Sequence, residues 1–370
     1  MALNLCPITL ERMSGAPLTL DTTAPVAELA AALINVPSRS GHEAELAGTI
    51  EARLRETTHL EVLRHGNTVA ARTSQGLPSR VLWAGHLDTV PANGNDSASI
   101  ADGVLIGRGS VDMKSGVATG LKLAIELVDP AVDATWIFYD NEEVESTKNG
   151  LRLFGAAHPE WVKGDFAIVG EPSNGIVEGG CNGTLRVEVS ATGTRAHSAR
   201  SWKGDNAIHR AQEILDRLVS YKPATVDVDG LSYREGMNAV GISGGVAGNV
   251  IPDLCTVTVN YRFAPDKGAR EAISIVRELF GGFEVVVVDE APGSRPGLTH
   301  PLVQEFVGAL GVEVAPKYGW TDVARFGEWG IPALNYGPGD PSLAHADDER
   351  VEIAQIEACY QGLKSWLTSH

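Results

Sequence analysis

Residues 81–90 read Val-Leu-Trp-Ala-Gly-His-Leu-Asp-Thr-Val, a short apolar run followed directly by a histidine and an aspartate. The run 81–84 has the length and composition of a buried strand, and similar runs follow at 135–139 and 166–169. Helical patterns separate these runs, the clearest of them over residues 115–128. This β-α-β alternation predicts an α/β fold built on a mixed, mostly parallel sheet.

Each of these apolar runs ends in a side chain that can bind a metal ion. His86 follows the first run, Glu142 and Glu143 follow the second, and Glu171 follows the third. In open α/β sheets, ligands bind in the crevice beyond the carboxyl ends of the strands. We therefore expect these side chains, which are far apart in the sequence, to lie together.

Two of these segments indicate how a metal ligand could be supported. Asp88 lies two residues after His86, so both side chains point to the same side of an extended chain. A metal-bound imidazole needs a partner for its second nitrogen, and Asp88 is placed to accept that hydrogen bond. Glu142 and Glu143 diverge, so one can bind metal while its neighbour acts as general base. Taken singly, each segment also has an ordinary explanation, as a structural turn or an exposed acidic pair.

Two further segments complete the candidate ligand set. Asp112 lies in a glycine-flanked loop that leads into a helix, where it could hold a cation or simply cap the helix. His345 lies in the acidic loop 344–349, which could also be a solvated surface loop. Two imidazoles and three carboxylates form a mixed N/O set that suits zinc, manganese or cobalt. Five ligands exceed the need of one tetrahedral zinc, so two ions that share a carboxylate would use them all.

Two helices are predicted before the first strand. Residues 25–36 have a proline at the first turn and are followed by Pro37. Ser40 and Glu43 then have the spacing of a capping box for a helix that runs to about Glu56. The first twenty or so residues show no clear periodicity, and we expect them to be a loose extension.

Between about residues 179 and 292 the pattern changes. Strand, helix, two strands, helix and strand are predicted at 185–191, 206–221, 239–246, 256–263, 269–280 and 283–288. This order predicts a compact ferredoxin-like α+β module inserted into the α/β domain. The chain then divides into a metal-binding catalytic domain, residues 1–178 and 293–370, and a lid or dimerisation domain, residues 179–292.

Composition argues against several classes of protein. The chain has 370 residues, enough for two domains, and its 43% hydrophobic and 21% charged residues are typical of globular proteins. A net charge of -17 disfavours binding to nucleic acid and to anionic membranes. No apolar run approaches the roughly 20 residues that cross a bilayer. Four scattered cysteines without a Cys-x-x-Cys pair fit a reducing compartment, so we predict a cytoplasmic protein.

The ordered motifs of the chain resemble those of the M20 family of co-catalytic zinc metallopeptidases. They are Gly-His-Leu-Asp-Thr-Val (85–90), Gly-Ser-Val-Asp-Met-Lys-Ser-Gly (109–116), Asn-Glu-Glu (141–143), Gly-Glu-Pro (170–172) and the late His345, within a likeness that begins near Pro25. The resemblance implies two divalent metal ions, zinc first, with cobalt or manganese as alternatives. Asp112 would bridge them, His86 and Glu171 would complete one site, and Glu143 and His345 the other. Glu142 would be the general base.

Within that family, residues 195–209 resemble the lid of actinobacterial enzymes that remove succinate from N-succinyl-L,L-diaminopimelate. The segment reads Arg-Ala-His-Ser-Ala-Arg-Ser-Trp-Lys-Gly-Asp-Asn-Ala-Ile-His, and 233–236, 249–253, 260–263 and 319–322 are similar to that group too. The likeness implies a homodimer through the lid, in which His197 reaches across to polarise the scissile carbonyl. Asn249, Arg262 and Thr321 would contact the substrate, the arginine by pairing its planar fork with a carboxylate.

Two departures from the family pattern bear on this reading. Gly180-Cys181-Asn182-Gly183-Thr184 stands where an arginine-rich run begins the lid, and Asn141 replaces the commoner aspartate before the glutamate pair. We expect Asn141 to change hydrogen bonding around the ligands rather than the ligand set.

The resemblance implies an enzyme acting on a small N-acyl amino acid, and it leaves two alternatives open. One is a different amide hydrolase of the same family, such as an acetylornithine deacetylase, an aminoacylase or a dipeptidase. The other is a metal-free scaffold protein on the same fold. Glu142 beside all five ligands argues against the scaffold, because a binding module has no need for a base.

Overall fold

A computed structural model describes residues 20–369, which fold into two compact units. Unit 1 comprises residues up to Glu178 together with Gly297–Ala315 and the chain from Arg325 onward. Unit 2 comprises Gly179–Pro296 and Pro316–Ala324. Unit 2 thus includes Pro316–Ala324, a short segment that the sequence had placed in the catalytic domain. The predicted N-terminal extension lies outside the described residues.

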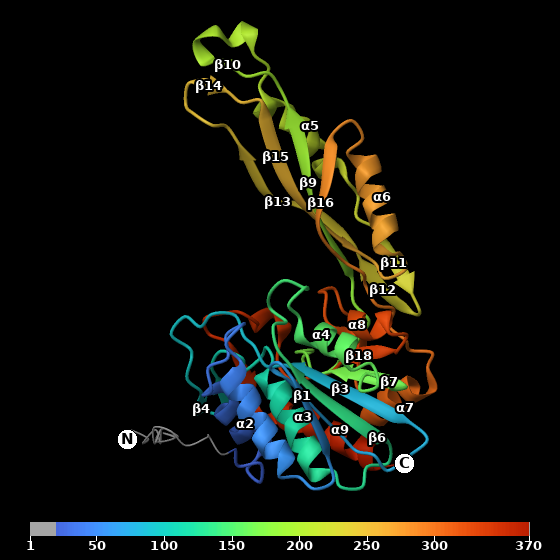
Figure 1. The fold of residues 1–370 in the computed structure, drawn as a ribbon. Helices are drawn as coiled ribbons and strands as arrows, with labels where there is room; N and C mark the ends of the chain where they lie inside the picture. The colour runs from blue at the N-terminus through green and yellow to red at the C-terminus, as the bar shows by residue number, and fades with distance from the viewer. Residues whose placement is uncertain (1–19, 370) are drawn as a thin grey trace. The chain divides into compact units, whose positions relative to one another are not determined.

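The main sheet of unit 1 has eight strands in the order β1-β2-β6-β3-β7-β18-β8-β17 (Figure 1). Its centre is parallel, because β3 pairs in parallel with β6 and β7, and β7 pairs in parallel with β18. The β1-β2-β6 edge is antiparallel. The strands are β1 (Glu61–His65), β2 (Thr68–Arg72), β3 (Arg80–His86), β6 (Asp133–Tyr139), β7 (Phe166–Val169), β8 (Val177–Gly179), β17 (Val314–Pro316) and β18 (Ala333–Asn335). The predicted mixed α/β fold is confirmed.

The central strands are buried along almost their whole length, as expected for parallel strands covered by helices. Helices α1, α3 and α9 pack against one another, α3 also packs on β3, and α2 packs on β1 and β2. The helices are α1 (Val26–Ile34), α2 (Ala44–Arg55), α3 (Lys114–Glu126), α4 (Gly150–Ala157), α7 (Pro301–Leu310), α8 (Val323–Glu328) and α9 (Ile353–Thr368). The apolar faces of α1, α2, α3, α7 and α9 form one core with the sheet.

Trp83 in β3 explains why glycine occurs near the end of β3, in the middle of α3 and directly after β7. A Cβ atom on Gly85, Gly120 or Gly170 would come within 2.5, 2.5 and 2.6 Å of its ring. Such distances are shorter than any van der Waals contact, so only glycine lets these segments approach the indole. Gly85 directly precedes His86 and Gly170 directly precedes Glu171. The tryptophan therefore sets the spacing of two predicted ligands.

The predicted capping box of α2 is wrong. The helix starts after Glu43 without a side-chain cap. The hydroxyl of Ser40 donates instead to Oδ2 of Asp88 at 2.8 Å, and Oε1 of Glu43 accepts from the amide of Gly41 at 2.8 Å. Ser40 is thus bound to the buried Asp88 and Glu43 to a backbone amide of the preceding loop, so neither side chain caps the helix.

A smaller three-stranded antiparallel sheet in unit 1 has the order β19-β5-β4. Its strands are β4 (Ser99–Ala101), β5 (Val104–Ile106) and β19 (Arg350–Glu352), and the short 3-10 helix η2 (Pro341–Leu343) precedes β19. The pairing of β19 with β5 brings the loop after η2 alongside the segment that follows β5.

Unit 2 contains a four-stranded antiparallel sheet in the order β13-β15-β9-β16, with α5 and α6 packed on it. The chain order is β9 (Gly183–Thr192), α5 (Ala207–Ser220), β13 (Gly236–Gly244), β15 (Leu254–Phe263), α6 (Ala269–Leu279) and β16 (Glu284–Ala291). This is the predicted β-α-β-β-α-β sequence with ferredoxin-like strand order. Apolar residues alternate along β9 and β15 and form a core with the two helices.

Sequence analysis missed the short elements of unit 2. Two short antiparallel ladders pair β11 (Thr225–Val228) with β12 (Leu231–Arg234) and β10 (Ala196–His197) with β14 (Val250–Ile251). The 3-10 helix η1 (Ser198–Lys203) follows β10. These elements are only two to six residues long, too short for a periodic pattern to be recognised.

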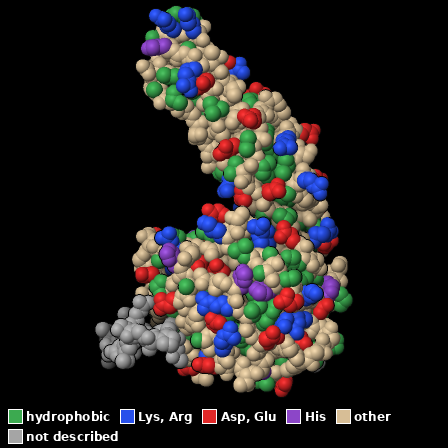
Figure 2. Space-filling model, viewed as in Figure 1, with side chains coloured by type: hydrophobic (Ala, Val, Ile, Leu, Met, Phe, Trp, Pro, Cys, Tyr) green, Lys and Arg blue, Asp and Glu red, His purple; other side chains and the backbone are tan. Residues whose placement is uncertain are grey.

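Within the described residues, no helix has the length and apolar character needed to cross a membrane. Figure 2 shows acidic and basic side chains interspersed on the visible face of each unit. Cys181, Cys255 and Cys359 are buried free thiols, and the fourth cysteine, Cys6, lies outside the described residues.

Candidate metal centre

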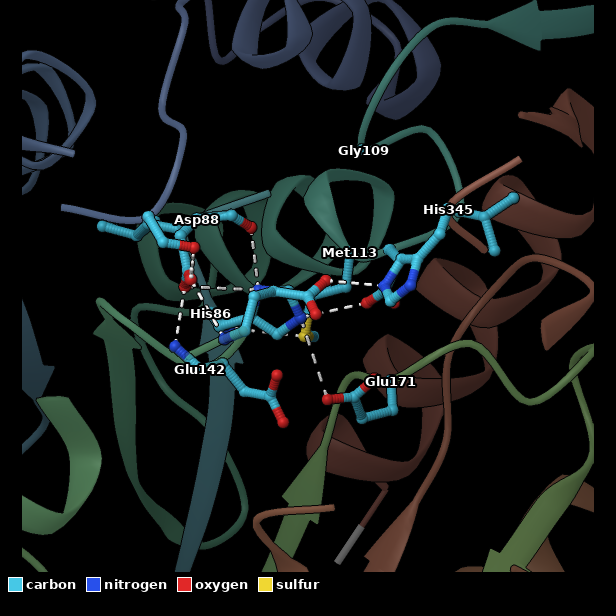
Figure 3. Close-up of polar contacts among 12 residues, drawn as sticks. His86, Asp88, Gly109, Met113, Glu142, Glu171 and His345 are labelled. Atoms are coloured by element: carbon cyan, nitrogen blue, oxygen red, sulfur yellow. Dashed lines mark hydrogen bonds and ion pairs between the residues drawn. The ribbon is translucent and has the colours of Figure 1, made fainter. Parts of the chain in front are cut away.

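The five predicted metal ligands come together in unit 1 at the carboxyl ends of the central strands (Figure 3). His86 ends β3, Glu143 follows β6 and Glu171 follows β7. Asp112 comes from the turn before α3, and His345 from the loop after η2. The topology that sequence analysis proposed thus brings these five residues to one place.

The ligand atoms divide into two groups that share one residue. Those of His86, Asp112 and Glu171 lie within 4.8 Å of one another, and so do those of Asp112, Glu143 and His345. This is the division that the family resemblance implied. A third group is formed by ligand atoms of His86, Glu142 and Glu143, which also lie within 4.8 Å of one another. Glu142 therefore lies at the same centre.

Asp112 offers a different oxygen to each histidine. Its Oδ1 lies 3.0 Å from Nε2 of His86, and its Oδ2 lies 3.3 Å from Nε2 of His345. Nε2 of His345 is also 2.9 Å from Oε1 of Glu143, and Nε2 of His86 is 3.9 Å from Oε1 of Glu171. A carboxylate between two imidazoles in this way has the arrangement required to bridge two cations.

The electrostatics of the centre favour positive charge. Burial alone would lower the pKa of His86, but Asp112, Glu171 and Asp88 raise it well above its usual value. Hydrogen bonds to Asp112 and Glu143 raise the pKa of His345 to about 10. Burial opposes ionisation of Asp112, yet His345 and His86 outweigh it and lower its pKa. The same negative field would stabilise a divalent cation in place of these protons.

The orientation of His86 fits a metal ligand. Its Nδ1 lies 2.9 Å from the backbone carbonyl oxygen of Asp88, which can only accept a hydrogen bond. Nδ1 therefore carries the proton in the neutral ring, and the lone pair of Nε2 faces Asp112 and Glu171. With two imidazoles, three carboxylates and no thiolate in the groups, the donor set suits zinc, manganese or cobalt.

The structure corrects the predicted role of the Asp88 carboxylate. Its nearer oxygen lies 3.6 Å from Nδ1 of His86, so the backbone carbonyl takes the hydrogen bond that was predicted for the side chain. The carboxylate accepts instead from the amides of Glu142 at 3.0 Å and Glu143 at 3.1 Å, and from the hydroxyl of Ser40. Asp88 is completely buried. It therefore holds in place the segment that carries the candidate base and one ligand.

Asn141, which stands where the family commonly has aspartate, has a left-handed backbone conformation. Its φ is +58°, a value that asparagine and aspartate both adopt more readily than most residues, so the backbone conformation does not explain the difference. The side-chain amide donates to Asp140 at 2.7 Å, and the backbone amide donates to Glu43 at 3.3 Å. These contacts agree with the prediction that Asn141 changes hydrogen bonding rather than the ligand set.

Three buried residues at the centre were missed by sequence analysis. Sδ of Met113 accepts from the amide of His86 at 3.3 Å, and Nζ of Lys114 donates to two carbonyl oxygens at the end of α1. Burial lowers the pKa of Lys114 to about 7. Glu349 accepts hydrogen bonds from the Asp112 turn. Lys114 and Glu349 lie within or beside the quoted motifs, but nothing local indicates which distant backbone groups they contact.

The remaining predicted site residues all lie in unit 2, so their part in catalysis stays a prediction. His197 and Asn249 are neighbours, because Ser198 donates its amide to the carbonyl of Asn249 at 2.9 Å. Arg262 lies near the end of β15 and is half-buried. Thr321 is buried, and its carbonyl accepts from the thiol of Cys181 at 3.7 Å.

Comparison with known proteins places the chain among metallopeptidases. Residues 82–369 match Peptidase family M20/M25/M40. The chain is 52% identical to a Mycobacterium tuberculosis (strain ATCC 25618 / H37Rv) protein described as a succinyl-diaminopimelate desuccinylase, over 94% of this chain and 99% of that protein. It is 46% identical to the succinyl-diaminopimelate desuccinylase of Corynebacterium glutamicum, over 91% of this chain and 94% of the relative.

Solved structures show the same fold at lower identity. A Bacillus subtilis protein described as a dinuclear metal-binding peptidase of the M20 family superposes with a TM-score of 0.69 at 16% identity. The match covers 92% of this chain and 96% of that structure.

Proposed function

Since the chain belongs to peptidase family M20/M25/M40 and is a metallo-amidohydrolase, we propose that it removes the succinyl group from N-succinyl-L,L-diaminopimelate. The products would be succinate and L,L-diaminopimelate, for lysine and cell-wall synthesis. Two relatives described as desuccinylases, 52% and 46% identical over more than nine-tenths of the chain, support this substrate. The observation that carries the amide-hydrolase chemistry is Asp112, with one carboxylate oxygen directed at each of two imidazoles.

We propose zinc as the metal in both positions. His86, Asp112 and Glu171 would hold one ion, and Asp112, Glu143 and His345 the other. When bound, such ions act as Lewis acids toward the amide oxygen and lower the pKa of a water to about 7. Divalent cobalt and manganese fit the same donors and are the alternatives.

Glu142 is the proposed general base. One of its carboxylate oxygens lies within 4.8 Å of ligand atoms of His86 and Glu143. Its backbone amide is anchored on Asp88, which fixes where the side chain starts. Glu142 would take a proton from the attacking water and later deliver it to the leaving amine.

His197 is proposed to stabilise the developing oxyanion of a substrate bound by a second subunit. Its Nδ1 accepts a hydrogen bond from the amide of Ala199 at 3.1 Å, so the neutral ring carries its proton on Nε2. The ring is exposed, and this Nε2–H is the type of donor that an oxyanion needs.

Arg262, Asn249 and Thr321 are proposed to bind the polar ends of the substrate. Arg262 is half-buried, and this partial loss of water around the guanidinium lowers its pKa. A substrate carboxylate paired with it in bidentate fashion would offset that cost.

A homodimer through unit 2 is part of the same proposal. β13 lies at the edge of its sheet, and Val240 and Ile242 on it are 61% and 57% exposed. Exposed β-branched residues on an unpaired edge favour association with another strand. We propose a cytoplasmic location, in keeping with the reduced cysteines.

The test is hydrolysis of N-succinyl-L,L-diaminopimelate by the purified protein with added zinc, beside N-acetylornithine and a chelator-treated control. We expect the succinyl substrate alone to turn over and the chelator to abolish turnover. Turnover of the acetyl substrate alone would overturn the substrate assignment and leave the metal centre. Inactivity on both with zinc bound would overturn the proposal as a whole.

A further inference from the structure

Glu349 is a completely buried carboxylate that lies beside the metal centre without belonging to either ligand group. Its Oε1 accepts the backbone amides of Gly109 at 3.0 Å, Val111 at 2.9 Å and Asp112 at 3.1 Å. Its Oε2 accepts from the buried guanidinium of Arg108 at 2.7 Å. One side chain thus organises the whole turn that carries the bridging ligand.

The position of Glu349 in the chain links this turn to the other histidine loop. Glu349 follows His345 by four residues and directly precedes β19. Its carbonyl accepts from the amide of Gly107 at 3.1 Å, which continues the pairing of β19 with β5. Backbone and side chain of one residue therefore join the Asp112 turn to the His345 loop.

Three amides of the turn can point at one oxygen of Glu349 only because of the backbone conformation of the turn. Gly109 has φ +88°, a left-handed value at which a side chain would be strained. A Cβ there would also lie 3.0 Å from the methyl group of Thr89 and 3.1 Å from the side chain of Lys114. Hydrogen bonds from three amides and an arginine to a carboxylate are charge-assisted and stronger than neutral ones. A neutral glutamine would keep one acceptor oxygen with weaker hydrogen bonds, and its NH₂ group would face either the amides of the turn or the guanidinium of Arg108, which are donors themselves.

We propose that Glu349 is a positioning residue for the metal group Asp112, Glu143 and His345. By fixing the Asp112 turn against the His345 loop, its carboxylate sets the affinity of this group for a divalent cation. The group His86, Asp112 and Glu171 depends on it less, because His86 and Glu171 are held by the ends of β3 and β7. The inference rests on the two-metal part of the proposed function and is independent of the substrate.

Asp133 provides a matched control in the same unit. It is 3% exposed and accepts the amides of Gln75 at 3.0 Å, Gly76 at 3.0 Å and Leu77 at 3.1 Å. Arg80 lies 3.4 Å from it, in the place that Arg108 takes beside Glu349. Asp133 begins β6, however, and the metal ligands follow the other end of that strand. Replacing it removes the same kind of anchor far from the centre.

The experiment compares Glu349→Gln, Asp133→Asn and the unaltered chain. Metal-free full-length protein is titrated with zinc chloride in competition with a chromophoric chelator, and thermal unfolding of the metal-free form is recorded. We expect two zinc ions per unaltered chain and two of unchanged affinity for Asp133→Asn. In Glu349→Gln, one zinc ion should bind with an affinity within about twofold of the original. The other should bind roughly 10–100-fold more weakly, which is the usual effect of losing a residue that supports a metal ligand.

A purely structural role would give a different pattern. If Glu349→Gln and Asp133→Asn lowered the unfolding temperature alike and neither changed zinc binding, the proposal would be overturned. Should Glu349→Gln fail to fold, Glu349→Asp retains the charge on a shorter side chain and is titrated in its place. It should weaken the same site by a smaller factor, and unchanged affinity there would also overturn the proposal.

The two proposals fail in distinguishable ways. An unaltered chain that binds fewer than two zinc ions would contradict both the two-metal centre and the role of Glu349. Two bound ions without hydrolysis of the succinyl substrate would contradict only the proposed function.

Discussion

Replacing Asp88 by asparagine tests how the centre holds Glu142, the proposed general base. Oδ1 of Asp88 accepts the amide of Glu142 at 3.0 Å, and Oδ2 accepts the amide of Glu143 at 3.1 Å and the hydroxyl of Ser40 at 2.8 Å. Asparagine offers one oxygen and one NH₂ group in the same space. In either orientation, one of the two amides faces another donor.

The cost follows from these contacts. A buried donor left without an acceptor costs about 1–3 kcal/mol, and loss of the charge weakens the remaining hydrogen bonds by about 1 kcal/mol more. If Glu142 is misplaced and the whole sum of about 2–4 kcal/mol is lost from the stabilisation of the transition state, kcat/KM falls roughly 30- to 1,000-fold. Ser40→Ala removes one hydrogen bond and leaves both amides satisfied, so about 1 kcal/mol, or roughly fivefold, is expected.

Steady-state hydrolysis of the succinyl substrate with saturating zinc measures the loss for both variants. Zinc affinity is measured separately in a His345→Ala background, in which His86, Asp112 and Glu171 remain as a group. His86 donates to the backbone carbonyl of residue 88, which the substitution retains. Affinity in that background should therefore change by less than about threefold for Asp88→Asn, well below the usual effect of losing a ligand's hydrogen-bond partner.

Two results would refute this reasoning. A loss of kcat/KM no larger than that of Ser40→Ala would show that the two amides do not depend on the carboxylate. A loss of activity accompanied by roughly tenfold weaker zinc binding in the His345→Ala background would show that the carboxylate orients His86 after all.

Three further outcomes are expected. Glu142→Gln should bind two zinc ions and lose about 10²–10⁴ in kcat, measured by titration and turnover; unchanged turnover would remove its role as base. Mixing inactive His197→Ala and Glu142→Gln proteins under conditions of subunit exchange should restore roughly a quarter of the original activity, because half of the dimers are hybrids with one complete site. No recovery would place His197 within its own subunit. Burial raises the pKa of Glu126, but hydrogen bonds from Lys122, Lys364 and Tyr360 outweigh it and lower the pKa to about 2 from 4.5. The resulting stability is present above pH 4.5 and lost as pH falls towards 2. Between pH 5 and 3, the unfolding temperature should therefore fall less for Glu126→Gln than for the unaltered chain. Parallel losses in the two proteins would contradict that pKa.

The central strands and the ligands could be predicted from the sequence because both depend on local patterns. The run 81–84 lies within β3, Arg80–His86, and the run 166–169 coincides with β7, Phe166–Val169. A short, continuous apolar run is typical of a parallel strand that helices cover on both faces, so few other structures fit these two runs. Since parallel strands end at one edge, the residues that follow them had to converge. Substrate identity, by contrast, came only from resemblance.

The contacts that support the site could not be predicted, because they join residues far apart in the sequence. Ser40 and Glu43 have the local spacing of a capping box, yet Ser40 bonds Asp88, 48 residues away. Glu349 reaches amides about 240 residues earlier in the chain. Distant contacts also explain why residues 316–324 belong to unit 2. The carbonyl of Lys317 accepts from the amide of Asn182, and the indole of Trp320 donates to the carbonyl of Pro292.

Whether a carboxylate at the centre is available to a metal ion depends on which donors already satisfy its oxygens. Asp88 accepts three hydrogen bonds and Glu349 accepts four, so their oxygens are already satisfied by donors within the protein. Asp112 and Glu143 direct oxygens at imidazole nitrogens that also face the centre. All four are simply acidic residues in the sequence. A carboxylate bound by amides shapes the site, and one that faces imidazoles can bind a cation. Substitutions of the first kind should therefore change metal affinity indirectly and by degrees, whereas substitutions of the second kind should remove an ion.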